Sequence, residues 1–295
     1  MIFFWEIESL SNRSLDFFIS KGPLVPANLN NPFNWGIYCV SGPLSEKLTV
    51  EISMNFAMNQ TIKNKKEIGA FYTPSDVTKV LSDWAIRMPS EFILEPSFGG
   101  CGFLEASKNR LKQLGNDRFI EQIFGCDIDQ RAFEHLEKKL GLTTLNNRFI
   151  LGDFLEIFPE NFTMQGFDVV LGNPPYISHH NMSAKQKFAV SRVMEYSGLK
   201  LSSKASLWAY FLIHGLHFLR AGGRMAWVLP GSFLSTEYGQ SLHSILINTF
   251  ERVASIVLNE RIFLIEGAEE RSVILLCENK GTKSKHGISL HSAES

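Results

Sequence analysis

Asn173, Pro174, Pro175 and Tyr176 combine chemical groups that can hold a flat, amino-bearing substrate. The asparagine brings an amide side chain and the tyrosine an aromatic face. The prolines fix their own φ angles and extend the residue before them, so the tetrapeptide is stiff. Because proline nitrogens carry no hydrogen, the carbonyl groups remain available as acceptors. The alternative interpretation is a proline-stiffened turn in which Tyr176 packs as a lid on the core.

Three acidic residues, Glu95, Asp127 and Asp153, each follow a hydrophobic run that precedes this tetrapeptide. The first of them, Glu95, opens the glycine-rich turn 95–104. The glycines let the backbone approach a ligand, and an acid in the turn suits a cationic ligand better than a pyrophosphate. Asp127 follows a second hydrophobic run and can accept both hydroxyls of a ribose. Asp153 can accept an adenine amino group while Phe154 covers the adenine face. Taken singly, each acid is equally well explained as a helix cap.

Hydrophobic runs that end just before these groups predict buried strands of a parallel sheet. The expected strands are 92–94, 120–126, 148–151, 169–171, 224–229, 252–258 and 272–277. The expected helices are one that begins at Thr73-Pro74, then 103–113, 130–140, 207–219 (closed by Gly222-Gly223) and 240–248. Residues 178–203 read as a long polar connection. This order predicts a doubly wound α/β fold, with seven mostly parallel strands and helices on both faces.

The length of 295 residues is enough for one large α/β domain with an accessory piece. Residues 1–60 show no clear period and are expected to form an irregular N-terminal segment. Residues 61–280 carry the alternating pattern, and 281–295 are expected to be a polar, frayed tail. No apolar run is long enough to span a membrane, and no basic region precedes the apolar start. We therefore expect a cytoplasmic protein without membrane attachment.

Charge and metal-ligand spacing narrow the functional classes. The four cysteines are scattered, and His214 and His217 share a helical face without further ligands, so no metal is expected. The formal net charge of −1 argues against tight autonomous binding of nucleic acid. Five basic residues nevertheless follow the tetrapeptide, and they fit a solvated loop and phosphate contacts equally well. They are Lys185, Lys187, Arg192, Lys200 and Lys204.

In this order, the motifs resemble the gamma-type adenine-N6 DNA methyltransferases of restriction–modification systems, which use S-adenosylmethionine (SAM). The resemblance covers about residues 66–278, with 69–74 as the carboxylate-binding segment. It implies a Rossmann-like SAM-dependent methyltransferase fold, catalysis by Asn173, Pro174, Pro175 and Tyr176, and stacking of Tyr176 and Phe263 on an adenine rotated out of duplex DNA. It also implies a set of cofactor contacts: Thr73, Glu95, Pro96, Gly99, Gly102, Asp127, Asp153, Phe154 and Asn173.

The chain departs from that family pattern in two places. The turn reads Gly-Gly-Cys-Gly where many relatives have Gly-Ser-Gly, and no target-recognition domain follows the last catalytic strand. A separate specificity subunit is therefore expected. The alternatives are a methyltransferase that acts on a protein glutamine or an rRNA base, and a non-catalytic SAM-binding subunit or remnant. The glycine spacing argues against a dinucleotide oxidoreductase.

Overall fold

The structure is a computed structural model that describes residues 73–141, 148–162, 164, 166–258, 271–284 and 287–293. Its strands are β1 (Ile93–Pro96), β2 (Ile123–Asp127), β3 (Phe149–Leu151), β4 (Phe167–Gly172), β5 (Leu219–Pro230), β6 (Phe250–Leu258), β7 (Ser272–Lys280) and β8 (Ile288–Ala293). Its α-helices are α2 (Ser75–Ala85), α3 (Gly102–Gln113), α4 (Gln130–Leu140), α5 (Ala184–Ser197), α6 (Leu207–Phe218), α7 (Ser232–Ser235) and α8 (Glu237–Thr249). Four short 3₁₀ turns include η2 (Phe154–Glu156) and η4 (His179–Asn181).

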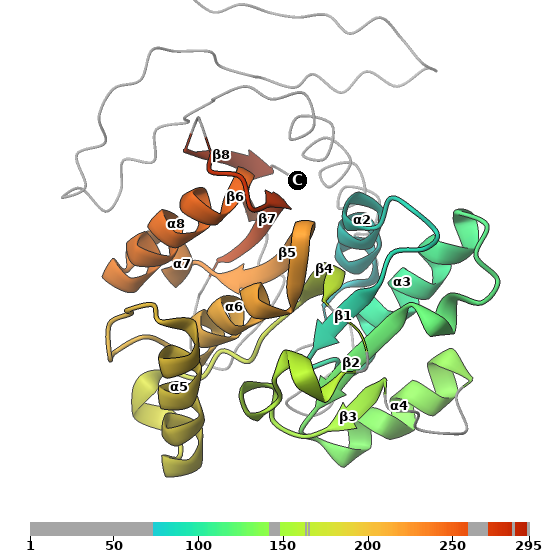
Figure 1. Cartoon of the computed structure of the whole chain (residues 1–295), viewed down its shortest axis with the longest axis horizontal. Coiled ribbons are helices and arrows are strands. Elements are labelled where there is room, and N and C mark those ends of the chain that lie inside the picture. The colour runs from blue at the N-terminus through green and yellow to red at the C-terminus, as the bar shows by residue number, and fades with distance from the viewer. Residues whose placement is uncertain are drawn as a thin grey trace, which may run out of the picture.

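All eight strands join one sheet in the order β3-β2-β1-β4-β5-β7-β6-β8 (Figure 1). Strands β1 to β5 run parallel to one another, whereas β7 is antiparallel to both of its neighbours, β5 and β6. The predicted seven-stranded, mostly parallel arrangement is confirmed for β1 to β7. An eighth strand, β8, pairs in parallel with β6.

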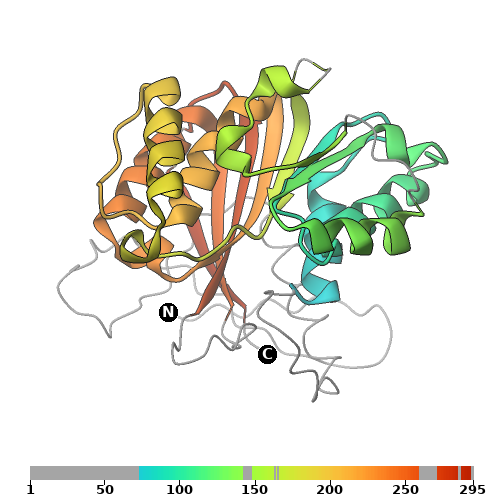
Figure 2. The same cartoon turned by 90° about the horizontal axis from the view of Figure 1, so that it is seen from below.

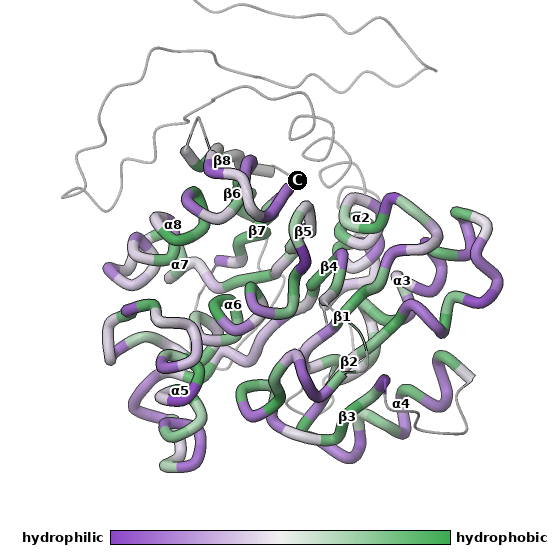
Figure 3. Tube along the Cα trace, viewed as in Figure 1, coloured by the Kyte–Doolittle hydropathy of each residue, from purple (hydrophilic) through white to green (hydrophobic). Residues whose placement is uncertain are grey.

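Two helix layers cover the sheet, α2 to α4 on one face and α5 to α8 on the other (Figure 2). Strand β4 is buried along its whole length. Val169 and Leu171 contribute to the core that α2, α3 and α4 share, whereas Val170 contributes to the core under α6 and α8. This alternation follows from the two-residue period of a strand, and burial on both faces explains the continuous apolar run. Figure 3 shows hydrophobic residues along the central strands and hydrophilic ones along the outer helices.

The helix after the second strand forms as predicted, over Gln130–Leu140. The Asp129 carboxylate accepts a hydrogen bond from the Arg131 N–H at 2.9 Å, which caps the first turn. Gly141 follows the last turn with a φ of 71°, a left-handed conformation that glycine adopts without a steric penalty. Two acids, Asp127 and Asp129, lie between the second strand and this helix. Because Asp129 caps α4, the Asp127 carboxylate is not needed as the cap.

Three sequence predictions are wrong. The connection 178–203 contains helix α5, which buries little more than Ala189 and Val193 and so has too thin an apolar stripe to read from sequence. Gly222 and Gly223 do not close α6, since β5 begins at Leu219, directly after that helix. They lie in a bulge, where the register against β4 shifts. The expected polar tail contains β8.

Two further predictions concern residues outside the described ranges. They are the irregular segment 1–60 and the base-stacking role of Phe263. Within the described part of the chain, every helix is too short or too polar to cross a membrane.

Candidate active site

The carboxyl ends of β1 to β4 meet at one edge of the sheet and bring the predicted residues together. Glu95 and Pro96 end β1, Asp127 ends β2, and Asp153 follows β3 by two residues. Asn173 follows β4 directly. This edge is where open parallel sheets bind their ligands, because successive strand–helix loops converge there.

Asp127 holds the glycine-rich turn in place. One of its carboxylate oxygens accepts the Gly99 N–H at 2.7 Å, and the other accepts the Asp129 N–H at 2.8 Å. The turn is tightly wound, with positive φ at Ser97 (66°), Gly99 (44°) and Cys101 (61°). A left-handed conformation costs a residue other than glycine about 1–2 kcal/mol. Such strain is typical of ligand sites, and it gives the Gly-Gly-Cys-Gly sequence a defined path.

The start of α2, the glycine-rich turn and the Asn-Pro-Pro-Tyr loop converge at Thr73. The Asn173 side-chain N–H donates a hydrogen bond to the Thr73 hydroxyl oxygen at 3.2 Å. A Cβ atom at Gly102 would lie 3.3 Å from the Thr78 Cγ2 atom and 3.9 Å from the Thr73 carbonyl oxygen. Gly102 therefore allows α3 to begin close under the first turn of α2.

Two buried acceptors at this edge have no hydrogen-bond donor among the described residues. They are the Oδ1 atom of Asn173 and the Oε2 atom of Glu95. The Pro174 carbonyl likewise receives no hydrogen bond from the described part of the protein. Since buried polar atoms are normally paired, each of these acceptors is suited to a donor that a ligand brings.

Burial shapes the electrostatics of the three strand-tip acids. It raises the pKa of Glu95 well above its usual range, and the nearby Asp127 raises it further. It also raises the pKa of Asp127 and of Asp153, although backbone N–H groups partly offset the effect. None of the three acids forms an ion pair with a described residue, although the charges of Lys139 and Lys185 act to lower the pKa of Glu95 and of Asp153. A cationic ligand would favour the ionised forms that burial disfavours.

Tyr176 lies half-buried beside β5. Its hydroxyl donates a hydrogen bond to the Val228 carbonyl oxygen at 3.2 Å, and its ring packs against the core under α6. The ring is therefore held in one orientation at the end of the proline-stiffened loop.

The structure bears on two predictions for the segment after β3. The Phe154 ring is 2% exposed and packs against Phe211 and His214, with ring centroids at 5.2 and 4.8 Å, so in this structure it belongs to the core and offers little surface to a ligand. Asp153 does cap a turn, since its carboxylate accepts the Leu155 N–H at 3.0 Å. The alternative of a structural cap therefore holds for Asp153, which leaves its second oxygen available.

Sequence reasoning missed two exposed aliphatic side chains at the same edge. Ile128 is 66% exposed and Leu151 is 51% exposed, and they flank Asp127 and Asp153. The strand register places Leu151 opposite Asp127. Large apolar residues that are exposed beside a carboxylate suit the flat faces of a bound ring. In the sequence they look like ordinary strand-end residues.

Comparison with known proteins gives a family and a fold. The family model of N-6 DNA Methylase matches residues 53–294. The type II methyltransferase M.AccI of Acinetobacter calcoaceticus is 24% identical over 237 residues, which cover 79% of this chain and 41% of M.AccI. The chain thus spans less than half the length of that relative.

Two solved structures share the fold. A Listeria monocytogenes protein assigned to the class I SAM-dependent methyltransferases aligns with a TM-score of 0.57 and 16% identity, over 85% of this chain and 75% of its own. The methyltransferase subunit of a type I restriction–modification system from Streptococcus thermophilus aligns with a TM-score of 0.54 and 19% identity, over 72% of this chain and 46% of its own. At these identities the likeness establishes the Rossmann-like fold of SAM-dependent methyltransferases.

Proposed function

This chain belongs to the N-6 DNA Methylase family, and we propose that it transfers a methyl group from SAM to the N6 amino group of adenine in DNA, as the modification activity of a restriction–modification system. The observation that carries the proposal is the buried, unpaired Oδ1 atom of Asn173 at the end of β4. It sits in a stiff loop beside three acids that form no ion pair with a described residue. The site therefore combines an acceptor for an amine with carboxylates that suit a cation.

The donor set fits SAM, which carries a sulfonium and an ammonium group. The unpaired Oε2 atom of Glu95 suits the ammonium group, and the desolvated acids together suit the positive charge. Asp127 already accepts two backbone N–H groups, and its remaining lone pairs suit the ribose hydroxyls. Helix α2 follows Thr73 and Pro74 and has no side-chain cap, so the backbone N–H groups of its first turn suit a carboxylate. Ile128 and Leu151 suit the faces of the cofactor's adenine.

Two acceptors activate the substrate amine in this proposal. The lone pair of an adenine amino group is delocalised into the ring, so the nitrogen is a weak nucleophile. The Asn173 Oδ1 atom and the Pro174 carbonyl oxygen each accept one amino N–H, which turns the lone pair out of the ring plane. Bound SAM would supply the methyl group, and its positively charged sulfur would leave with the electron pair of the broken carbon–sulfur bond. Asn173 holds one amino N–H while the nitrogen attacks, and that proton is released to water once the nitrogen carries the new methyl group.

Tyr176 supports the base in this reaction. Adenine N6 cannot be reached inside a duplex, so the base must rotate out of the stack. The half-buried Tyr176 ring, fixed by its bond to the Val228 carbonyl, offers a flat apolar surface for stacking. Phe263 stays a candidate for the second stacking surface.

We also propose that a separate specificity subunit supplies target recognition. The Streptococcus thermophilus relative is itself called a subunit of a type I system. The near-zero net charge of this chain favours few phosphate contacts, and phosphate contacts position a protein without specifying sequence. Sequence is specified by contacts to base edges, which we assign to the other subunit.

Calorimetric titration of the purified chain with SAM tests the cofactor site. We expect Asp127→Ala to weaken SAM binding by about 1–3 kcal/mol, because buried hydroxyl groups lose their acceptor. Asp129→Ala is the matched control, since this acid lies two residues away, caps α4 and pairs with the exposed Arg131 side chain. Folded wild-type protein that binds no SAM would overturn the proposal. Tritiated methyl transfer to duplex DNA, compared with protein and rRNA, then identifies the substrate.

A further inference from the structure

Helix α5 presents an exposed face that combines basic and aromatic side chains. Ala189 and Val193 are buried on its inner side. On the outer side, Lys185, Phe188 and Arg192 are spaced three and four residues apart, so they form one stripe. Phe188 is 64% exposed, which is unusual for a phenylalanine without a partner surface.

The stripe begins beside the candidate active site. Lys185 forms an ion pair with Glu156 at 2.9 Å, which ties the first turn of α5 to η2, the turn that Asp153 caps. The chain reaches α5 from Tyr176 through η4 alone. Figure 1 and Figure 2 both show α5 on the outer side of α6. An occupant of the stripe would therefore lie next to whatever the Asn-Pro-Pro-Tyr loop holds.

The charge of α5 is opposite to that of the rest of the chain. The helix carries three basic residues and one acidic residue, a net of +2, whereas the whole chain carries −1. Lys187 makes no ion pair with any described residue. The Arg192 guanidinium lies over the Phe158 ring at 5.2 Å, which holds it in place without neutralising its charge. Lys187 and Arg192 are therefore available to an anionic partner.

We propose that the stripe Lys185, Phe188 and Arg192, with the adjoining Lys187, binds the DNA duplex beside the target adenine. This inference rests on the proposed function and adds the surface that holds the substrate. Lys187 and Arg192 contact phosphates, and Phe188 packs against deoxyribose or a base edge. A recognition subunit is the less favoured occupant, because the core of a protein interface is depleted in lysine and in charged residues generally.

Fluorescence anisotropy with a labelled mixed-sequence duplex, at several salt concentrations and without SAM, tests this surface on the full chain. We expect weak wild-type binding that falls with salt. The double variant Lys187→Gln/Arg192→Gln should bind more weakly and lower the salt slope by about two, since each phosphate contact contributes about 0.9. Phe188→Ala should weaken binding several-fold and leave the salt slope unchanged, because it removes an apolar contact.

Lys138→Gln is the matched control, since Lys138 is an exposed lysine on α4, on the opposite face of the sheet, and has no ion-pair partner in the described structure. It should bind DNA as the wild type does. No DNA binding at low salt, or an unchanged salt slope in the double variant, would overturn the inference. So would variants that keep their DNA affinity and lose only association with a recognition subunit. A chain that binds DNA through α5 but binds no SAM would instead overturn the proposed function.

Discussion

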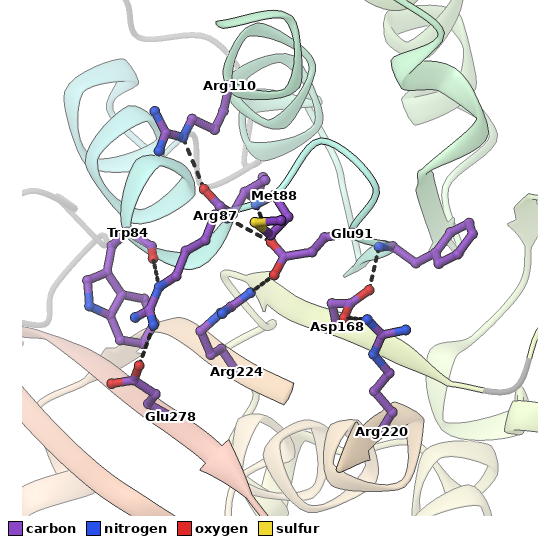
Figure 4. Close-up of polar contacts among 11 residues, drawn as sticks. Trp84, Arg87, Met88, Glu91, Arg110, Asp168, Arg220, Arg224 and Glu278 are labelled. Carbon is purple, nitrogen blue, oxygen red and sulfur yellow. Dashed lines mark hydrogen bonds and ion pairs between the residues drawn. The ribbon is translucent and has the colours of Figure 1, made fainter. Parts of the chain in front are cut away.

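The two edges of the central sheet hold buried carboxylates in opposite environments. At the edge where β1 and β4 begin, Glu91 pairs with Arg224 and Asp168 pairs with Arg220 (Figure 4). At the edge where the same strands end, Glu95 forms no ion pair with a described residue, and its Oε2 atom has no hydrogen-bond partner there. Both edges belong to the same strands, so the difference lies in the partners and not in the fold.

We call the edge where β1 and β4 begin the amino edge and the edge where they end the carboxyl edge. At the amino edge, backbone N–H groups also donate hydrogen bonds to the buried acids. Glu91 accepts the N–H groups of Arg87 and Met88 at 2.7 and 3.2 Å, and Asp168 accepts the Phe92 N–H at 2.8 Å. These bonds fix the loop between α2 and β1 against β4. At the amino edge each buried acid has an arginine partner, although the Arg87 Nη2 and Arg224 Nε atoms stay without a hydrogen-bond acceptor among the described residues. At the carboxyl edge the acids form no ion pair with a described residue, and their burial is destabilising until a ligand compensates it. We infer that function occupies the edge that the fold leaves unsatisfied.

Glu91→Ala should give the largest loss of stability. It leaves Arg224, whose side chain is 10% exposed, without its partner. Breaking a buried ion pair from one side typically costs 3–5 kcal/mol. Chemical denaturation measures this loss. Glu121→Ala is the matched control because its pair with Arg118 is exposed, and it should cost less than about 1 kcal/mol. Equal losses in the two variants would remove the distinction between the edges.

Asn173→Ala should give the largest loss of activity at the carboxyl edge. The side chain acts on the amine in the transition state, so its removal should lower the methyl-transfer rate by about 10²–10³-fold, as for loss of one transition-state hydrogen-bond partner. SAM affinity should stay nearly unchanged, since the loss belongs to the chemical step. Tritiated methyl transfer and calorimetry on one preparation separate the two effects. Full activity of the variant would contradict the assigned role.

The carboxyl edge was largely predictable because its residues are local to the strands that carry them. Asp127 ends a strand and Asn173 follows one, so the topology of a parallel sheet brings them together. The amino edge was not predictable. Arg224 meets Glu91 across 133 residues, and neither residue belongs to a motif.

Burial that no local sequence pattern shows explains the other differences between sequence and structure. The Phe154 motif resembles an adenine pocket, but the ring packs into the core because α6 supplies Phe211 and His214 beside it. No local pattern in the sequence shows that packing. Helix α5 was not predicted for the opposite reason. Most of its residues face outward, so its sequence lacks a clear apolar stripe.

The pair of variants Glu95→Gln and Glu278→Gln should change the stability of the ligand-free protein in opposite directions near neutral pH. Glu278 bonds to Arg252 at 2.8 Å and pairs with Arg87, so its neutralisation should cost about 1–3 kcal/mol. Glu95→Gln removes a buried acid whose ionisation burial disfavours, so it should raise the melting temperature. It should also weaken SAM binding about 10- to 100-fold, since a charged hydrogen bond contributes about 1.5–3 kcal/mol. Destabilisation by both variants would show that Glu95 is already compensated.

The smallest expected effect is on the pH dependence of stability, which should differ in sign between Glu95 and Glu278. Burial raises the pKa of Glu95, so the native protein holds a proton that the unfolded chain releases. Stability should therefore fall as the pH rises from the ordinary carboxyl pKa of about 4 toward the raised value. Burial also acts to raise the pKa of Glu278, but its bonds to Arg87 and Arg252 lower it overall. The stability that Glu278 contributes is present above its ordinary pKa and is lost as the pH falls through the lowered one.

A cationic ligand should reverse the situation at the carboxyl edge only. Binding of SAM favours the ionised form of Glu95, so it should release protons, and affinity should rise with pH until this group is ionised. Calorimetry in buffers of different ionisation enthalpy measures that release. Glu95→Gln should reduce it, whereas Glu278→Gln should leave it unchanged because the arginines keep that carboxylate ionised. Binding without proton release at mildly acidic pH would mean that Glu95 is ionised before the ligand arrives, and the unsatisfied edge would then need another source of compensation.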